Sequence, residues 1–189
     1  MTRATTGTPR DDLFTHIHKA LRLALFELAI QAGRTDWTSE ADVADLDRVW
    51  QAVLALLRVH SAHEDRYIFR LLDDRDPLAT EPAADQHRDL DDLLEHVAQR
   101  FQSVVAEPDP ATGLALYRDL NRFIAAYLPH LHEEETHVMA RIWECCSDEE
   151  IAATRAAFMA DTPPDVQATA LQYVLAAIDP PTRRVLTAR

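Results

Sequence analysis

The sequence contains two pairs of residues with the spacing His-x-x-x-Glu: His60 with Glu64, and His130 with Glu134. Residues four positions apart lie one turn apart on the same face of an α-helix. Imidazole and carboxylate groups together suit iron, manganese or zinc, and carboxylates from opposite helices of a bundle can bridge a pair of ions. The repeated pair therefore predicts a metal site to which two helices contribute.

Two more histidines, His18 and His87, stand at the helical spacing of apolar residues, where leucine would be expected. A single histidine on an apolar face is more often a hydrogen-bonded core residue than a metal ligand. Here each of four predicted helices places a histidine on its apolar face, and a buried polar group without a partner costs about 1–3 kcal/mol. A bound cation would compensate for this cost. The predicted metal ligands are His18, His60, Glu64, His87, His130 and Glu134.

Four long segments with helical periodicity carry these residues, and short breaks rich in Gly, Pro or Asp separate them. Four comparable helices with short links predict an all-α fold, an up-down-up-down four-helix bundle over residues 11–146. Gly33 is expected to end the first helix, and Ser39 to cap the second. The expected helices cover about residues 11–31, from the 38–42 region to 72, 82–105 and 111–146.

The C-terminal part, residues 147–189, is expected to be a helical extension packed on the bundle. Ser147 and Glu150 have the spacing of a capping box, which predicts a short helix to about Ala160. The sequence Asp-Thr-Pro-Pro at 161–164 predicts the start of another helix, to about Ile178. Such an extension could bind a protein partner or form a dimer with a second copy of the chain.

The composition argues against several classes of function. The formal net charge is −13 and no basic patch is evident, so no nucleic-acid partner is expected. The 3 Gly are too few and too scattered for a phosphate-binding loop, and no serine has the flanking residues of a nucleophile motif. Charged residues interrupt the longest apolar runs and the first residues are polar, so neither a membrane segment nor a signal peptide is expected.

The two cysteines, Cys145 and Cys146, are neighbours in a predicted helix, which is a poor geometry for a disulfide between them. No disulfide framework is therefore expected, and the sequence fits a reducing, cytoplasmic location. Thr and Pro among the first ten residues predict a mobile tail.

Four segments resemble the motif-bearing helices of the hemerythrin/HHE cation-binding family: IHKALR at 17–22, HSAHEDRYIF at 60–69, DQHRDLDDLL at 85–94 and HLHEEETHV at 130–138. The resemblance covers about residues 11–146 and depends chiefly on the two His-x-x-x-Glu pairs. It implies a carboxylate-bridged, non-haem di-iron centre. The implied terminal ligands are His60 and His130, the implied bridging carboxylates are Glu64 and Glu134, and His18 and His87 complete the set.

Proteins of this family bind O₂ reversibly, sense O₂, iron or redox state, or react with peroxide or nitric oxide, so the resemblance implies a small diatomic or peroxide ligand. The third helix departs from the pattern of hemerythrins proper, which carry a second histidine one turn from the first. The neighbouring positions here are Ala83 and Asp91. Asp91, His63, His132 or Glu135, or a water molecule, could complete the coordination. The missing second histidine argues against reversible O₂ carriage. Sensing and redox chemistry remain compatible with the sequence.

Several other residues are expected to lie around the site without binding metal. His16 and His96 are expected at the surface, and His137 near the edge of the site. Tyr67 and Tyr127 flank the site by helical spacing, where they would pack or hydrogen-bond to a bound ligand.

The leading hypothesis is a hemerythrin-like di-iron protein that binds or senses O₂, peroxide or nitric oxide; whether the centre is catalytic stays open. One alternative is a helical interaction module that a zinc or iron ion stabilises, and manganese also suits the ligands. Another is a ferritin-like di-iron oxidase. Sites of that type need Glu-x-x-His on two helices, and here only Glu134 and His137 offer it, on the fourth helix.

Overall fold

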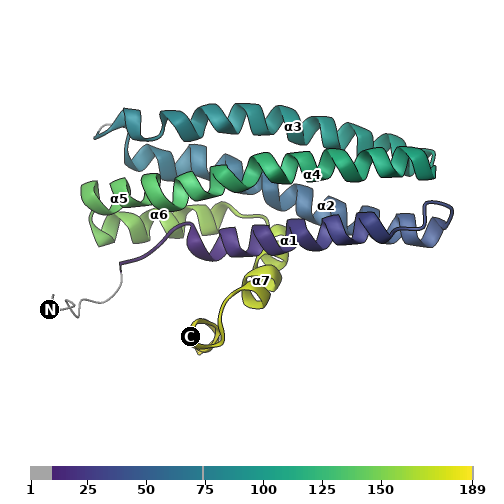
Figure 1. Ribbon diagram of the computed structural model, residues 1–189. Coiled ribbons are helices and arrows are strands. Elements are labelled where there is room, and N and C mark those ends of the chain that lie inside the picture. Colours follow the sequence, from purple (N-terminus) through teal and green to yellow (C-terminus); the bar gives the residue numbers. More distant parts are fainter. Residues whose placement is uncertain (1–9, 74, 189) are drawn as a thin grey trace, which may run out of the picture.

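Four long helices make up most of the chain: α1 (Thr15–Arg34), α2 (Glu40–His63), α3 (Glu81–Ala106) and α4 (Pro110–Glu133). The computed structural model describes residues 10–73 and 75–188. Contacts join α1 to α2, α2 to α3, α3 to α4 and α4 to α1. Figure 1 shows the four helices side by side, with the chain reversing direction at each connection. The predicted all-α class is confirmed, since all regular structure in the described residues is helical.

Shorter helical segments continue α2 and α4. The helix α2 passes into a π-helical turn, η1 (Glu64–Ile68), and a 3-10 turn, η2 (Phe69–Leu71), and a second 3-10 turn, η3 (Pro77–Ala79), precedes α3. The helix α4 passes into another π-helical turn, η4 (Glu134–Val138), and then into α5 (Met139–Cys145). The predicted extents to residues 72 and 146 are therefore nearly correct, but these two helices are not regular α-helices throughout.

Side-chain caps fix where two of the long helices begin. The Ser39 hydroxyl accepts a hydrogen bond from the amide of Asp42 at 3.3 Å, as the sequence predicted. The Asp109 carboxylate accepts one from the amide of Thr112 at 2.9 Å, ahead of a proline in the first turn of α4. Such caps satisfy amides that have no partner within the helix.

Both predicted ends of the first helix are wrong. The helix begins at Thr15 rather than near residue 11, because the Asp12 carboxylate accepts hydrogen bonds from the amides of Phe14 and Thr15, at 2.9 and 2.8 Å, and holds a turn there. Gly33 does not end the helix, which continues to Arg34.

A close approach joins the α1–α2 connection to the start of α4. A Cβ added at Gly113 would lie 2.3 Å from the indole of Trp37, so no larger residue fits there without moving that ring. Trp37 is buried and belongs to the apolar core of the bundle. Gly113 is therefore needed for packing.

The apolar core is divided into two clusters. The larger one runs along the bundle and includes Leu21, Leu57, Leu90 and Leu131. The smaller one lies toward the α5 end and includes Phe14, Ile68, Ala83 and Val138. Along the sequence of each long helix and the residues that flank it, the predicted metal-binding residues lie between a member of one cluster and a member of the other. The polar residues therefore form a layer between two apolar regions.

The C-terminal segments are helices α6 (Asp148–Asp161), α7 (Pro164–Ala177) and α8 (Pro180–Thr187). The predicted capping box of Ser147 and Glu150 is confirmed. The helix α7 contacts α1 and α2, and α6 contacts η1 (Figure 1). A double hydrogen bond from Arg155 to Asp11, at 2.6 and 2.7 Å, also ties α6 to the start of the bundle. The sequence did not predict α8, and the division into two parts at residue 146 stays a prediction.

Within the described part of the chain, no helix combines the length and the apolar character needed to cross a membrane. The predicted mobile tail falls mostly on residues 1–9, which lie outside the described residues.

Candidate metal centre

Each of the four long helices places one histidine in the polar layer: His18 on α1, His60 on α2, His87 on α3 and His130 on α4. All four are buried, with exposed fractions between 0% and 8%. Glu64 and Glu134 follow directly after α2 and α4, with exposed fractions of 1% and 0%. The structure thus brings all six predicted residues together in the interior.

Each glutamate is the first residue of a π-helical turn. The amide of Glu64 donates to the carbonyls of both His60 and Ser61, and the carbonyl of Glu64 accepts from the amide of Phe69, five residues on. The same pattern surrounds Glu134. A π-helical turn inserts a residue into the helical register, and such turns occur frequently at functional sites. The His-x-x-x-Glu spacing gave no sign of these turns, which reset the direction of every side chain after the glutamates.

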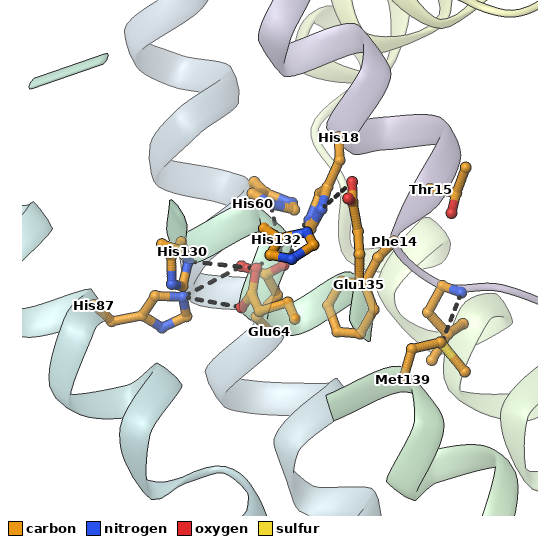
Figure 2. Close-up of polar contacts among 12 residues, drawn as sticks. Phe14, Thr15, His18, His60, Glu64, His87, His130, His132, Glu135 and Met139 are labelled. Atoms are coloured by element: carbon orange, nitrogen blue, oxygen red, sulfur yellow. Dashed lines mark hydrogen bonds and ion pairs between the residues drawn. The ribbon is translucent and has the colours of Figure 1, made fainter. Parts of the chain in front are cut away.

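The Glu64 carboxylate lies between three of the histidines. Its Oε1 is 3.0 Å from Nε2 of His60 and 3.5 Å from Nε2 of His18. Its Oε2 is 3.4 Å from Nε2 of His87. Figure 2 shows these rings arranged around Glu64.

The Glu134 carboxylate has a matching position. Its Oε2 is 3.3 Å from Nε2 of His130 and 3.5 Å from Nε2 of His18. Its Oε1 is 3.5 Å from Nε2 of His87. Both carboxylates therefore lie between histidines from opposite ends of the polar layer.

These residues form two sets that could each hold a cation. One set is His18, His60, Glu64 and Glu134, and the other is Glu64, His87, His130 and Glu134. In each set the candidate ligand atoms lie within 4.8 Å of one another. We refer to these sets as the His18/His60 position and the His87/His130 position. Both glutamates belong to both positions.

The atoms that face the centre have no hydrogen-bond partners in the described structure. They are Nε2 of His18, His60 and His87, and both carboxylate oxygens of Glu64 and of Glu134. A buried polar atom left without a partner costs about 1–3 kcal/mol, and more if it is charged. Cations at the two positions would give these atoms partners, so the residues present fit a metal centre.

Polar side chains behind the histidines hold the rings in place. Nδ1 of His18 lies 3.1 Å from a carboxylate oxygen of Glu135 (Figure 2). Arg22 in turn contacts that oxygen at 2.6 Å. Nδ1 of His87 lies 2.8 Å from the Asp65 carboxylate. A histidine that donates its other ring N–H to a carboxylate keeps its free nitrogen toward a metal.

His130 is held in a different way. Its Nδ1 lies 3.1 Å from the side-chain oxygen of Gln86, so a neutral amide replaces the carboxylate there. Its ring also packs against the rings of His87 and Tyr127, with centroids 4.7 and 5.7 Å apart. The three supports at Glu135, Asp65 and Gln86 were not predicted as such, because their sequence positions alone do not show which histidine they face.

Two of the histidines favour the protonated form. Burial alone would lower the pKa of His18, but the hydrogen bond to Glu135 and the nearby Glu64 and Glu134 carboxylates raise it to about 9. Burial also opposes protonation of His87, but the Asp65 carboxylate and the two buried glutamates raise its pKa to about 12. Both rings are therefore protonated on both nitrogens, and positively charged, at neutral pH.

The remaining groups titrate in the opposite sense. Burial lowers the pKa of His60 to about 3 and that of His130 to about 4. Burial and the nearby Glu64 carboxylate raise the pKa of Glu134 to about 8. Burial opposes ionisation of Glu64 as well, but the surrounding histidines hold its pKa below the usual range. A cation would have to displace protons from part of this cluster, because metal ligands bind in their deprotonated forms.

The residues considered for completing the coordination lie outside both positions. Glu135 instead supports His18, as described above. His63 faces α6, 3.7 Å from the Asp161 carboxylate and with its ring close to that of Phe158. His132 is exposed. Asp91 is largely exposed but lines a small cavity beside Glu64 and His87.

The other residues near the site were placed with mixed success. Tyr127 is buried and packs beside His130, whereas Tyr67 packs against His63 away from the centre. His96 is exposed as predicted. His137 is 69% exposed and pairs with an oxygen of Glu133 at 2.8 Å, so it lies at the surface rather than near the edge of the site.

The comparison with protein families agrees with this geometry. The family described as "Hemerythrin HHE cation binding domain" matches residues 10–142. That match covers more than half of the chain and includes all six residues of the centre, so the chain belongs to the hemerythrin HHE cation-binding family. The comparisons with curated proteins and with solved structures gave no match. The buried cluster and the family together define a metal-binding helical protein.

Proposed function

We propose that this protein is a non-haem di-iron protein that binds or senses O₂, peroxide or nitric oxide. The observation that carries the proposal is that two sets of four ligand groups share both glutamates. Two separate mononuclear sites would have no reason to share their carboxylates, whereas a carboxylate-bridged pair of ions requires it.

In this proposal the histidines are terminal ligands and Glu64 and Glu134 are the bridges. His18 and His60 would bind one iron, and His87 and His130 would bind the other. Two imidazoles and two carboxylate oxygens at each position also suit manganese or zinc, so iron is chosen on the family resemblance. Bound iron would supply an open coordination position and electrons for a small oxidising ligand.

The chain's own residues provide the surroundings for that chemistry. Apolar clusters on both sides of the polar layer exclude water from it. Glu135 and Asp65 hold His18 and His87 in orientation and favour positive charge on their rings. Tyr127 closes part of the wall beside His130 and stays protonated, because burial raises its pKa well above the usual value. These contacts fix the orientation of the rings and limit the access of water to the site.

Elemental analysis combined with absorption spectroscopy tests the proposal. We expect two irons per chain, with charge-transfer absorption that changes on reduction and on exposure to O₂ or peroxide. One zinc per chain and no response to oxidants would contradict the proposal and favour the interaction module. That alternative has structural support in the exposed Leu171 on α7 and Val185 and Leu186 on α8, where a protein partner or a second copy of the chain could bind.

The ferritin-like alternative is weakened by the position of His137. That histidine is the one that would complete Glu-x-x-His with Glu134, and it faces solvent. Steady-state O₂ consumption with an organic substrate would revive this alternative. A cytoplasmic location is also part of the proposal; it accords with the two free cysteines, Cys145 and Cys146.

A further inference from the structure

An acidic hollow opens on the face between α2 and α3. Its volume is about 470 Å³. Four carboxylates and one guanidinium line it, from Asp65, Asp91, Asp92, Glu95 and Arg58. The Arg58 guanidinium pairs with Glu95 at 3.1 Å, and Asp65 is engaged by His87. The hollow therefore carries a net negative charge at its surface.

A second, much smaller cavity lies deeper, against the metal centre. Its volume is about 20 Å³, which is enough for about one water molecule. Glu64, His87 and His130 form its polar inner wall, and Tyr127 adds a hydroxyl-bearing ring. Both oxygens of Glu64 and Nε2 of His87 are buried without hydrogen-bond partners in the described structure. The cavity thus ends at atoms that a cation would satisfy.

The two spaces share part of their lining. Ser61, Asp91 and Leu94 border both the outer hollow and the inner cavity. The acidic hollow and the inner cavity therefore adjoin at this rim of three side chains. The Asp91 carboxylate is exposed and borders both spaces, so a cation that moves between them can bind it.

We propose that divalent cations reach the centre through this rim, with Asp91 as a transient ligand between solvent and the His87/His130 position. This inference rests on the proposed function, since it concerns how the same centre is filled. A negatively charged hollow with low-dielectric walls raises the local concentration of cations and lowers that of anions. Arg58 is the one cationic side chain lining the hollow, and Glu95 neutralises it.

The path leads to one position before the other. The inner cavity touches His87 and His130, whereas neither His18 nor His60 lines it. His18 is completely buried and lies against the ring of Phe14, with centroids 5.2 Å apart. A cation that enters by this path and moves on to the His18/His60 position would therefore meet the shared carboxylates of Glu64 and Glu134 first.

The test is the rate at which Co²⁺ alone fills and leaves the full-length protein. Uptake is followed by visible absorption in a stopped-flow instrument, and release by transfer to excess chelator. We expect Asp91→Asn to slow uptake by about 3- to 10-fold at low ionic strength, with a smaller effect at high salt. Release should slow by a similar factor, leaving the dissociation constant within about twofold of wild type, because a residue on the path alters the barrier in both directions.

Asp89→Asn is the matched control. Asp89 lies on the same helix two residues away, is exposed, and lines neither space. Its uptake rate should stay close to that of wild type. A second variant, Ser61→Leu, narrows the rim without changing charge and should slow uptake and release at every ionic strength. Circular dichroism checks that the variants fold, and if Ser61→Leu does not fold, Asp91→Asn decides alone.

Two results would overturn the path. One is an Asp91→Asn uptake rate no slower than that of Asp89→Asn. The other is unchanged uptake with weakened affinity, which would make Asp91 a permanent ligand. Failure of the proposed function looks different: the wild-type protein would then bind no pair of cations at all. Normal binding of two Co²⁺ ions with unaltered rates in the variants would reject the path and leave the centre intact.

Discussion

The two cation positions share both glutamates but differ in their surroundings. The His18/His60 position is enclosed, with His18 completely buried and supported by a carboxylate that Arg22 holds. The His87/His130 position borders the small cavity and has one carboxylate and one amide behind its rings. Equal numbers of imidazoles and carboxylates therefore do not make equal positions.

The difference suggests a division of roles. A fully enclosed ion with charged support behind its histidine should exchange slowly and act mainly to hold the centre together. An ion beside a cavity should exchange faster and be the one that an external ligand reaches. The two positions should therefore be coupled through the glutamates, which belong to both, and should differ in how fast their ions exchange.

The largest effect is expected from Glu64→Ala. Because this carboxylate belongs to both positions, its loss should remove both cations, from two per chain to nearly none. Glu144→Ala, at an exposed site paired with Arg141, serves as the control and should keep both. Elemental analysis after purification and dialysis measures the result. Two ions retained in the Glu64→Ala protein would show that this glutamate does not bridge.

The next effect separates the positions. His18→Ala should leave one cation, at the His87/His130 position, and His87→Ala should leave one at the His18/His60 position. The ion that remains in His18→Ala should transfer to a chelator faster than the one in His87→Ala, because only the former borders the cavity. His96→Ala, at an exposed histidine, controls for nonspecific loss. Equal release rates would remove the distinction between the positions.

A smaller effect is expected from the supporting carboxylates. Glu135→Gln should weaken cation affinity at the His18/His60 position by about 10- to 100-fold, and Asp65→Asn should do the same at the other position. Each removes the acceptor behind one histidine while nearly preserving its shape. Competition titration with a metal indicator measures both affinities. Glu133→Gln, whose carboxylate pairs with the exposed His137, should have no effect; a loss equal to that in Glu135→Gln would indicate a general charge effect.

The most gradual effect is that of pH. The pKa values of about 9 for His18 and about 12 for His87 mean that both rings are protonated at pH 7 and must lose a proton to bind metal. Zn²⁺ binding at pH 7 should therefore release protons, and each displaced proton should lower the apparent affinity by about tenfold per unit of acidification.

The two positions should respond differently at high pH. Above pH 9 His18 has already lost its proton, so its share of the release should disappear, while that of His87 persists. An indicator dye in weak buffer measures proton release at pH 7 and at pH 10. If Zn²⁺ binding released no protons at pH 7, His18 and His87 would not be protonated in the metal-free protein.

Much of the fold could be predicted from local sequence. The caps at Ser39 and Ser147 and the apolar stripes of the four long helices depend on residues close together in the chain, and the structure confirms them. The errors lie at the ends of the first helix and at the two π-helical turns. Gly33 looked like a terminator but lies inside α1, and the straight helices expected through Glu64 and Glu134 contain π-helical turns.

The sequence by itself determined which side chains turn inward, because a helix repeats every 3.6 residues and the inward-facing positions can be counted along the chain. That reasoning predicted the six buried residues that the structure brings together, and their role as metal ligands stays a prediction. Tertiary structure alone decided which histidines share a position, that both glutamates lie between the positions, and which carboxylate supports which ring. It also decided where the cavity opens. These features depend on how far each helix is rotated and shifted against its neighbours, and packing across the whole bundle sets those quantities.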